Sequence, residues 1–222
     1  MKLIAWLSNW LFPEKCILCG KLLESQEMDL CRKCRSEAPD CPISKIKYPF
    51  IDQWTALWYY EGNVRKSLLR YKFNNRRSHA AGYGRLLAMK LLREDRTDFD
   101  LLTYIPISHR RKRKRGFDQV ELLAEHVGKE LDVTPVRTLE KVRHNRQQSR
   151  IVGFAQRRAN VLGAYMVLDP QQIQGKRILL LDDIVTTGAT ASECARILLT
   201  AGAKEVQFAV VASANHQTRN NR

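Results

Sequence analysis

Two adjacent carboxylates and a run of hydroxyl side chains follow one another within residues 181–190. The carboxylates are Asp182 and Asp183. The turn after them contains Thr186, Thr187, Gly188, Ala189 and Thr190. Free N–H groups at a helix start bind phosphate, and a glycine lets the backbone approach it closely. Carboxylates accept hydrogen bonds from ribose hydroxyls or hold a water of Mg2+. The segment therefore predicts a ribose-phosphate site.

A strand and a helix are expected to position these residues. The apolar run 178–181 is typical of a buried central strand in a parallel sheet, with the carboxylates where it ends. Thr190 and Glu193 have the spacing of a capping box, which predicts that a helix begins there. Ligands of open α/β sheets bind beyond the carboxyl ends of the strands. The alternative is a buried strand, an acidic turn and a capped helix without a ligand.

A basic segment follows a second predicted buried strand, residues 101–107. After His109 come six basic residues, and a helix is predicted to follow through Lys129. A basic loop between strand and helix is suited to hold pyrophosphate; Arg115 and Gln119, near the helix start, are the candidates. The alternatives are a solvated charge run or a nucleic-acid-binding patch. That patch would consist of Arg110, Arg111, Lys112, Arg113 and Lys114.

Four cysteines near the N-terminus have the spacing C-x2-C-x11-C-x2-C. They are Cys16, Cys19, Cys31 and Cys34. Two such pairs complete a tetrahedral thiolate site, which predicts zinc. The zinc is expected to be structural, because four cysteines leave no position for a catalytic water. The alternatives are a pair of disulfides, which the expected cytosolic setting disfavours, and four unrelated thiols, in which the doubled C-x2-C spacing rarely arises by chance. Cys41 and Cys194 fall outside the pattern and are interpreted as ordinary small residues.

The net charge of +15 favours a polyanionic partner, either nucleic acid or a phosphate-rich ligand. No apolar run approaches the ~20 residues that span a bilayer, so we expect a soluble, cytoplasmic protein. Residues 1–12 have helical apolar spacing and no cleavage site, which favours an amphipathic helix packed on the protein over a signal peptide or a membrane-surface helix.

The remaining pattern predicts further elements of an α/β fold. We expect strands at 54–60, 136–142, 163–168 and 205–211, and helices at 64–73 and 80–93. The polar segment 143–160 is interpreted as a long loop of the kind that closes over ligands.

Several motifs resemble known families. L-L-L-D-D-I-V-T-T-G-A-T resembles the signature of type I phosphoribosyltransferases, which bind 5-phosphoribosyl pyrophosphate (PRPP). From about residue 12 to 211 the chain is similar to the ComF (GntX-like) family. The similarity rests on the four-cysteine module, I-P-I followed by R-K-R-G-F-D-Q, then R-H-N-R-Q-Q-S, Q-R-R-A-N-V and the signature above.

The resemblance implies a zinc module at residues 1–43 and a type I phosphoribosyltransferase-like domain at 44–222, a parallel sheet flanked by helices. It also implies a cytoplasmic role in natural transformation, handling incoming single-stranded DNA alongside other DNA-uptake proteins. By position, residues 186–190 would hold the 5-phosphate of PRPP, and Asp182 with Asp183 the ribose hydroxyls and Mg2+.

The same resemblance implies a pyrophosphate-binding set and one departure from it. Pro106, Arg115 and Gln119 would hold pyrophosphate, and the segment around Arg146 would close over it. Where the family usually has asparagine, this chain has Asp118, whose carboxylate would repel pyrophosphate unless Mg2+ or an arginine compensates.

Two functional hypotheses follow. One is a phosphoribosyltransferase that displaces pyrophosphate from PRPP through orientation and charge stabilisation, with an acceptor that the sequence does not name. The other is a non-catalytic single-stranded DNA-binding or regulatory protein that uses the fold only for binding.

Overall fold

The structure is a computed structural model that describes residues 13–43, 46–143 and 161–215. The predicted helix at 1–12 and most of the predicted loop at 143–160 lie outside the described residues.

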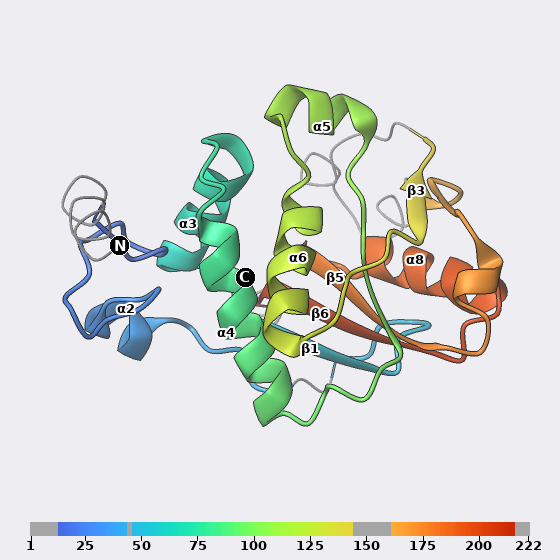
Figure 1. The fold of residues 1–222 in the computed structure, drawn as a ribbon, viewed down its shortest axis with the longest axis horizontal. Coiled ribbons are helices and arrows are strands. Elements are labelled where there is room, and N and C mark those ends of the chain that lie inside the picture. The colour runs from blue at the N-terminus through green and yellow to red at the C-terminus, as the bar shows by residue number, and fades with distance from the viewer. Residues whose placement is uncertain (1–12, 44–45, 144–160, 216–222) are drawn as a thin grey trace, which may run out of the picture.

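A four-stranded parallel sheet forms the centre of the molecule. Its strands are β1 (Gln53–Tyr59), β6 (Glu205–Ser213), β5 (Arg177–Val185) and β2 (Leu101–Tyr104), in that order across the sheet. Residues 178–181 and 206–213 are buried, since helices cover both faces, and this is why they form nearly continuous apolar runs. The predicted parallel sheet with flanking helices is confirmed (Figure 1).

Two of the wrongly predicted strand ends lie near the acidic pair. β2 ends at Tyr104, three residues earlier than expected, because Pro106 has no N–H to continue the ladder. β5 continues to Val185, so the acidic pair lies within the strand and not after it. Asp182 and its successors keep pairing with β6, which supplies partners as far as Ser213.

Helices cover the sheet on both sides. α4 (His79–Arg93) packs on β1 and β6, and α6 (Gln119–Leu131) packs on β2 and β5, with the two helices side by side on one face. α8 (Ala189–Thr200) covers the other face (Figure 1). α3 (Gly62–Phe73) joins the core beside α4 through Leu68 and Tyr71, both fully buried.

Two short strands form a separate antiparallel sheet. β3 (Leu139–Lys141) pairs with β4 (Tyr165–Val167), and both are shorter than predicted. A 3-10 turn, η2 (Pro170–Gln172), leads from β4 into β5. β4 packs on α8, so this small sheet lies on the α8 side of the molecule.

The cysteine-containing segment packs against α3 and α4. It includes α2 (Arg32–Glu37), and its buried residues Ile17, Leu18 and Leu30 belong to the same apolar cluster as Leu68 and Tyr83. None of the helices in the described ranges has the length and apolar character needed to cross a bilayer.

Candidate functional site

Gly188 shapes the turn between β5 and α8. Its φ of +74° is in the left-handed region, and a Cβ there would lie 2.1 Å from Cδ1 of Tyr48. The predicted capping box does not form, because the helix begins at Ala189 with Gly188 as its N-cap. The Glu193 carboxylate instead accepts a hydrogen bond from the Gly163 N–H at 3.0 Å and pairs with Arg196.

The two carboxylates of the acidic pair have different surroundings. Asp183 is 4% exposed; its Oδ1 lies 2.9 Å from the Lys72 ammonium, and its Oδ2 accepts from Gln119 Nε2 at 3.0 Å. Asp182 is half-buried and accepts a hydrogen bond from the Asp183 N–H. Burial, and then the charge of Asp183, raise the pKa of Asp182 well above its usual value.

Three residues predicted from two separate motifs form one chain of contacts. Arg115 donates to Gln119 Oε1 at 2.7 Å, and Gln119 donates in turn to Asp183. Pro106 is buried next to Ile105, whose N–H bonds the carbonyl of Leu181, the β5 residue directly before the acidic pair. The remaining predicted contact, Arg146, is outside the described residues.

Asp118 caps α6, a role that the sequence analysis did not anticipate. Its buried carboxylate accepts hydrogen bonds from the N–H groups of Ile107 and Val120, both at 2.9 Å. Burial raises its pKa, and these amide contacts oppose that shift. The carboxylate is thus directed at the backbone between β2 and α6, where its charge is partly offset.

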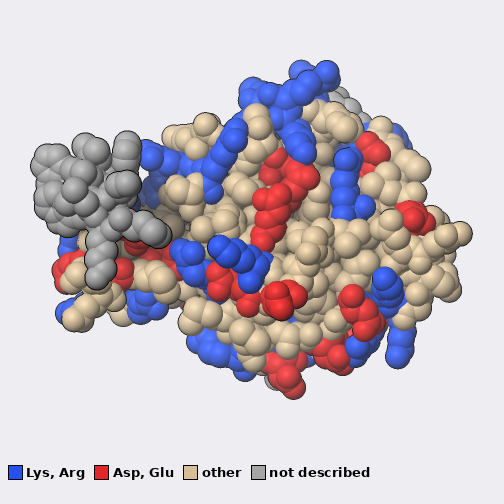
Figure 2. Space-filling model, viewed as in Figure 1, with Lys and Arg blue, Asp and Glu red and all other residues tan. Residues whose placement is uncertain are grey.

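The basic segment is a helix, α5 (His109–Arg115), and the predicted basic loop is wrong. Arginine and lysine are good helix formers, and Gly116, with φ of +77°, ends the helix. No residue of α5 is buried. Figure 2 shows basic side chains gathered over α5 at the top of the molecule.

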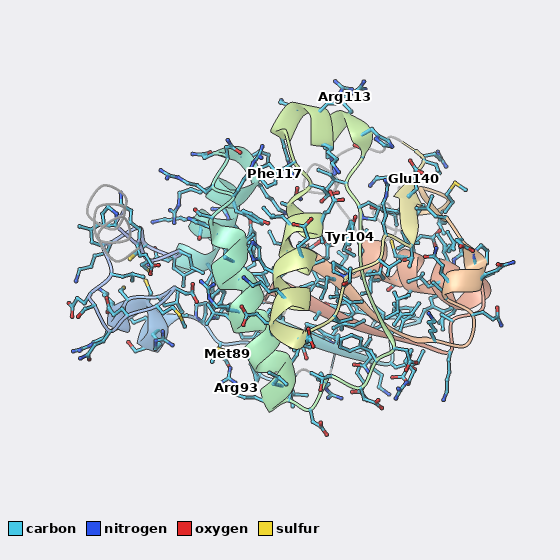
Figure 3. The ribbon with its side chains drawn as sticks, in the orientation of Figure 1. Met89, Arg93, Tyr104, Arg113, Phe117 and Glu140 are labelled. Carbon is cyan, nitrogen blue, oxygen red and sulfur yellow. The ribbon has the colours of Figure 1, made fainter. Side chains whose placement is uncertain are left out.

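Polar contacts attach α5 to the rest of the fold. His109 Nε2 lies 2.8 Å from Glu140 Oε1, and Lys112 Nζ lies 2.6 Å from Glu121 Oε2. Glu121 also accepts from the Tyr104 hydroxyl. Figure 3 shows Glu140 on β3 and Arg113 at the outer side of α5.

Two arginines stack on aromatic rings where α5 meets α3. The Arg115 guanidinium lies 5.0 Å from the ring centre of Phe73, and that of Arg77 lies 4.8 Å from the ring centre of Phe117. Phe73 is 60% exposed, whereas Phe117 is buried at the start of α6 (Figure 3). Of these two rings, Phe73 is the one exposed enough to stack on a nucleic-acid base.

The four cysteines converge as predicted. Their Sγ atoms lie within 4.8 Å of one another, and none is in a disulfide. Cys19 and Cys31 have their Sγ atoms 3.7 Å apart, close to the ~3.8 Å edge of a tetrahedron with Zn–S bonds of about 2.3 Å. The donor set and its spacing fit a structural zinc ion.

Comparison with known proteins identifies the family. A family model described as "Phosphoribosyl transferase domain" matches residues 119–222, and "Double zinc ribbon domain" matches residues 7–44. Competence protein ComFC of Streptococcus pneumoniae is 30% identical over 87% of this chain and 97% of its own length. The chain belongs to the ComF family.

Other ComF relatives align over similar lengths. Competence protein F of Haemophilus influenzae is 25% identical, over 88% of this chain and 95% of its own. DNA utilization protein YhgH of Salmonella typhi is 29% identical, over 90% of this chain and 89% of its own. Among solved structures, a glutamine PRPP amidotransferase from B. subtilis is 20% identical at a TM-score of 0.45, over 64% of this ComF chain and 30% of that chain.

Two residues of this ComF-family site were missed by sequence reasoning. Lys72 is one of several basic residues on α3, and only the packing of α3 reveals that it meets Asp183. Lys141 on β3 donates to the Tyr165 hydroxyl at 2.9 Å. Burial lowers the pKa of Lys141 to about 8. The charge of Arg111 also lowers this pKa, and that of Asp182 raises it.

Proposed function

We propose that this protein binds PRPP with Mg2+ at the end of β5 and serves in DNA uptake and natural transformation in the cytoplasm. One observation carries the proposal: Lys72 and Gln119 contact Asp183, and Arg115 contacts Gln119, beside the glycine turn that opens α8. The family models for a phosphoribosyltransferase domain and a zinc ribbon support it, as do the names of the competence and DNA utilization relatives.

Each group in the site has a proposed role. The N–H groups and hydroxyls of residues 186–190 bind the 5-phosphate, helped by the dipole of α8. Asp182 and Asp183 bind the ribose hydroxyls and water of Mg2+. Arg115 and Gln119, with Pro106 fixing the backbone after β2 and Arg146 closing from its loop, bind pyrophosphate.

The proposed reaction is phosphoribosyl transfer. An acceptor attacks the anomeric carbon of PRPP. The bond between that carbon and the pyrophosphate oxygen breaks, and pyrophosphate leaves with both bonding electrons. The side chains supply orientation and charge stabilisation and form no covalent bond to the sugar. Lys141, whose pKa burial lowers to about 8, is a further group proposed to hold or release a proton near that pH.

A binding-only function is the second candidate. It is favoured by α5, a helix of basic residues with no buried side chain, next to the exposed ring of Phe73. We expect single-stranded DNA to bind here, with affinity that falls steeply with salt because counterions are released. The triple variant Arg110→Gln/Arg113→Gln/Lys114→Gln should reduce the slope of log affinity against log salt concentration by about 2. Each of the three lost phosphate contacts contributes ~0.7 to that slope. Fluorescence anisotropy of a labelled oligonucleotide measures it; unchanged, salt-insensitive binding would refute this surface.

Thermal denaturation distinguishes which ligands bind the site. Mg-PRPP should raise the melting temperature by mass action more than ribose 5-phosphate or pyrophosphate alone, because it occupies both halves of the site. Pyrophosphate release with bases, nucleotides or single-stranded DNA then decides between the two candidates. A Mg-PRPP shift without pyrophosphate release from PRPP in the presence of any acceptor favours the binding-only function, and no shift at millimolar ligand contradicts the PRPP site itself.

A further inference from the structure

One helix, α3, contacts both the cysteine cluster and the acidic pair. Four of its side chains make these contacts: Ser67 and Arg70 with the turn between the first two cysteines, Lys72 with Asp183, and Tyr71 with Gln119, which in turn bonds Asp183. They follow one another within six residues, so a shift of α3 moves both sets together. The proposed function assigns no role to this connection.

The contacts toward the cysteines are made to the turn between the first two thiols. The Ser67 hydroxyl donates to the Ile17 carbonyl, and Arg70 Nη2 donates to the Leu18 carbonyl at 2.6 Å. Ile17 and Leu18 are the two residues between Cys16 and Cys19, and both are buried. The geometry of this turn is fixed when its two cysteines share a metal ion.

The contacts toward the acidic pair reach both oxygens of Asp183. Lys72 pairs with Oδ1 directly. The buried Tyr71 hydroxyl donates to the Gln119 carbonyl at 2.6 Å, and the Gln119 side chain donates to Oδ2. The two groups that hold Asp183 therefore depend on where α3 lies.

We propose that zinc in the four-cysteine site sets the PRPP affinity of the β5 site through α3, with Ser67 and Arg70 as positioning residues. This inference rests on the proposed PRPP binding. A twelve-residue helix is marginal by itself, so its position depends on tertiary contacts. Without the ordered turn, Ser67 and Arg70 lose their acceptors, and Lys72 and Gln119 are no longer held against Asp183.

The coupling is reciprocal. If zinc raises PRPP affinity by a given factor, PRPP must raise zinc affinity by the same factor. Couplings of this kind span about 5- to 150-fold. Zinc affinity, measured by competition with a chromogenic chelator, is therefore a readout that does not depend on turnover.

The first test compares two substitutions of equal charge change on α3. Arg70→Gln removes the contact with the turn, whereas Lys66→Gln alters an exposed residue of the same helix. Mg-PRPP affinity is measured by calorimetry on zinc-saturated full-length protein. We expect a loss of about fivefold or more for Arg70→Gln and no change for Lys66→Gln. Equal affinities in the two variants would overturn the coupling.

The second test uses the wild type and stands even if Arg70→Gln fails to fold. Zinc affinity should rise about fivefold or more when Mg-PRPP is added, and stay constant in Asp182→Asn/Asp183→Asn, which controls for zinc binding by PRPP itself. If wild type binds PRPP and its zinc affinity does not change, the coupling is overturned and the proposed PRPP binding stands. Wild type that binds no PRPP contradicts the proposed function, and the coupling falls with it.

Discussion

The ammonium of Lys72 lies 2.9 Å from Oδ1 of Asp183, which links α3 to the end of β5. Both side chains are largely buried, at 18% and 5% exposure, so the pair is shielded from solvent. Gln119 occupies the other carboxylate oxygen. Asp183 is consequently held in one orientation before any ligand arrives, the condition under which a carboxylate can position ribose and Mg2+ without reorganisation.

Removing Lys72 should cost both stability and ligand affinity. Lys72→Met leaves a buried carboxylate without its cation, and we expect a loss of about 3 kcal/mol in the free energy of unfolding. PRPP affinity should fall about 10- to 100-fold, as when a residue orienting a metal ligand is lost. Denaturant unfolding and calorimetry measure the two effects.

The matched control for this change is Lys112→Met, which removes an exposed ion pair with Glu121 and should cost under about 1 kcal/mol. Lys72→Met/Asp183→Asn should recover part of the lost stability, because the unpaired charge is gone. Equal costs for the two lysines would contradict the importance of the buried pair.

Substitution of Gly188 should be more damaging than that of another left-handed glycine. Gly175 has a φ of +69° and open space around it, so Gly175→Ala should cost only the backbone strain, about 1 kcal/mol. Gly188→Ala adds the overlap with Tyr48, and we expect at least about 2 kcal/mol more. Thermal unfolding of the two variants side by side measures the difference; identical melting temperatures would mean that Tyr48 does not constrain the turn.

The stability of Asp182→Asn should depend on pH in a definite direction. The raised pKa of Asp182 means that the folded state binds its proton more tightly than the unfolded state. The contribution of Asp182 to wild-type stability therefore falls as pH rises through the unfolded aspartate pKa of about 4 toward the raised value. Asparagine keeps the acceptor for the Asp183 N–H and carries no charge.

We therefore expect Asp182→Asn to be more stable than wild type by about 1 kcal/mol at pH 7.5 without Mg2+, with the advantage vanishing near pH 4. The measurement is urea unfolding of both proteins across this range. An advantage that grows toward low pH would show that the pKa of Asp182 is lowered and not raised.

Loss of one cluster thiol should release the metal. Cys34→Ser should reduce bound zinc from about one per chain to a small fraction and lower the melting temperature, because metal that binds only the folded cluster stabilises the folded state. Cys194→Ala alters a buried thiol outside the cluster and should keep the metal. Elemental analysis decides; full zinc occupancy in Cys34→Ser would exclude this ligand set.

The sequence was sufficient for features that local pattern determines. Apolar runs located β5 and β6, and the doubled C-x2-C spacing predicted the cysteine cluster. The acidic pair and glycine turn were placed correctly beside one another. The end of β5 was predicted wrongly, because β6 continues to offer hydrogen-bond partners beyond Leu181. The length of β5 therefore depends on strand pairing, which the local pattern does not reveal.

The errors and omissions concern contacts between distant segments. The Asp118 carboxylate caps α6 and bonds Ile107, which a comparison of one position with a family pattern cannot reveal. Lys72 could not be chosen among the basic residues of α3, since its role depends on where α3 packs. The basic run forms a helix because arginine and lysine are good helix formers, and Gly116 ends it. The charge of the run drew the interpretation toward a loop.

Calorimetric titration of Mg-PRPP into wild type and Asp182→Asn/Asp183→Asn tests whether PRPP binds at the acidic pair. We expect one site per chain in wild type. We also expect at least about 100-fold weaker binding in the variant, because both carboxylates that would hold ribose and Mg2+ have lost their charge. Equal affinity in both proteins would place PRPP elsewhere, and no binding to wild type would contradict the proposed PRPP binding outright.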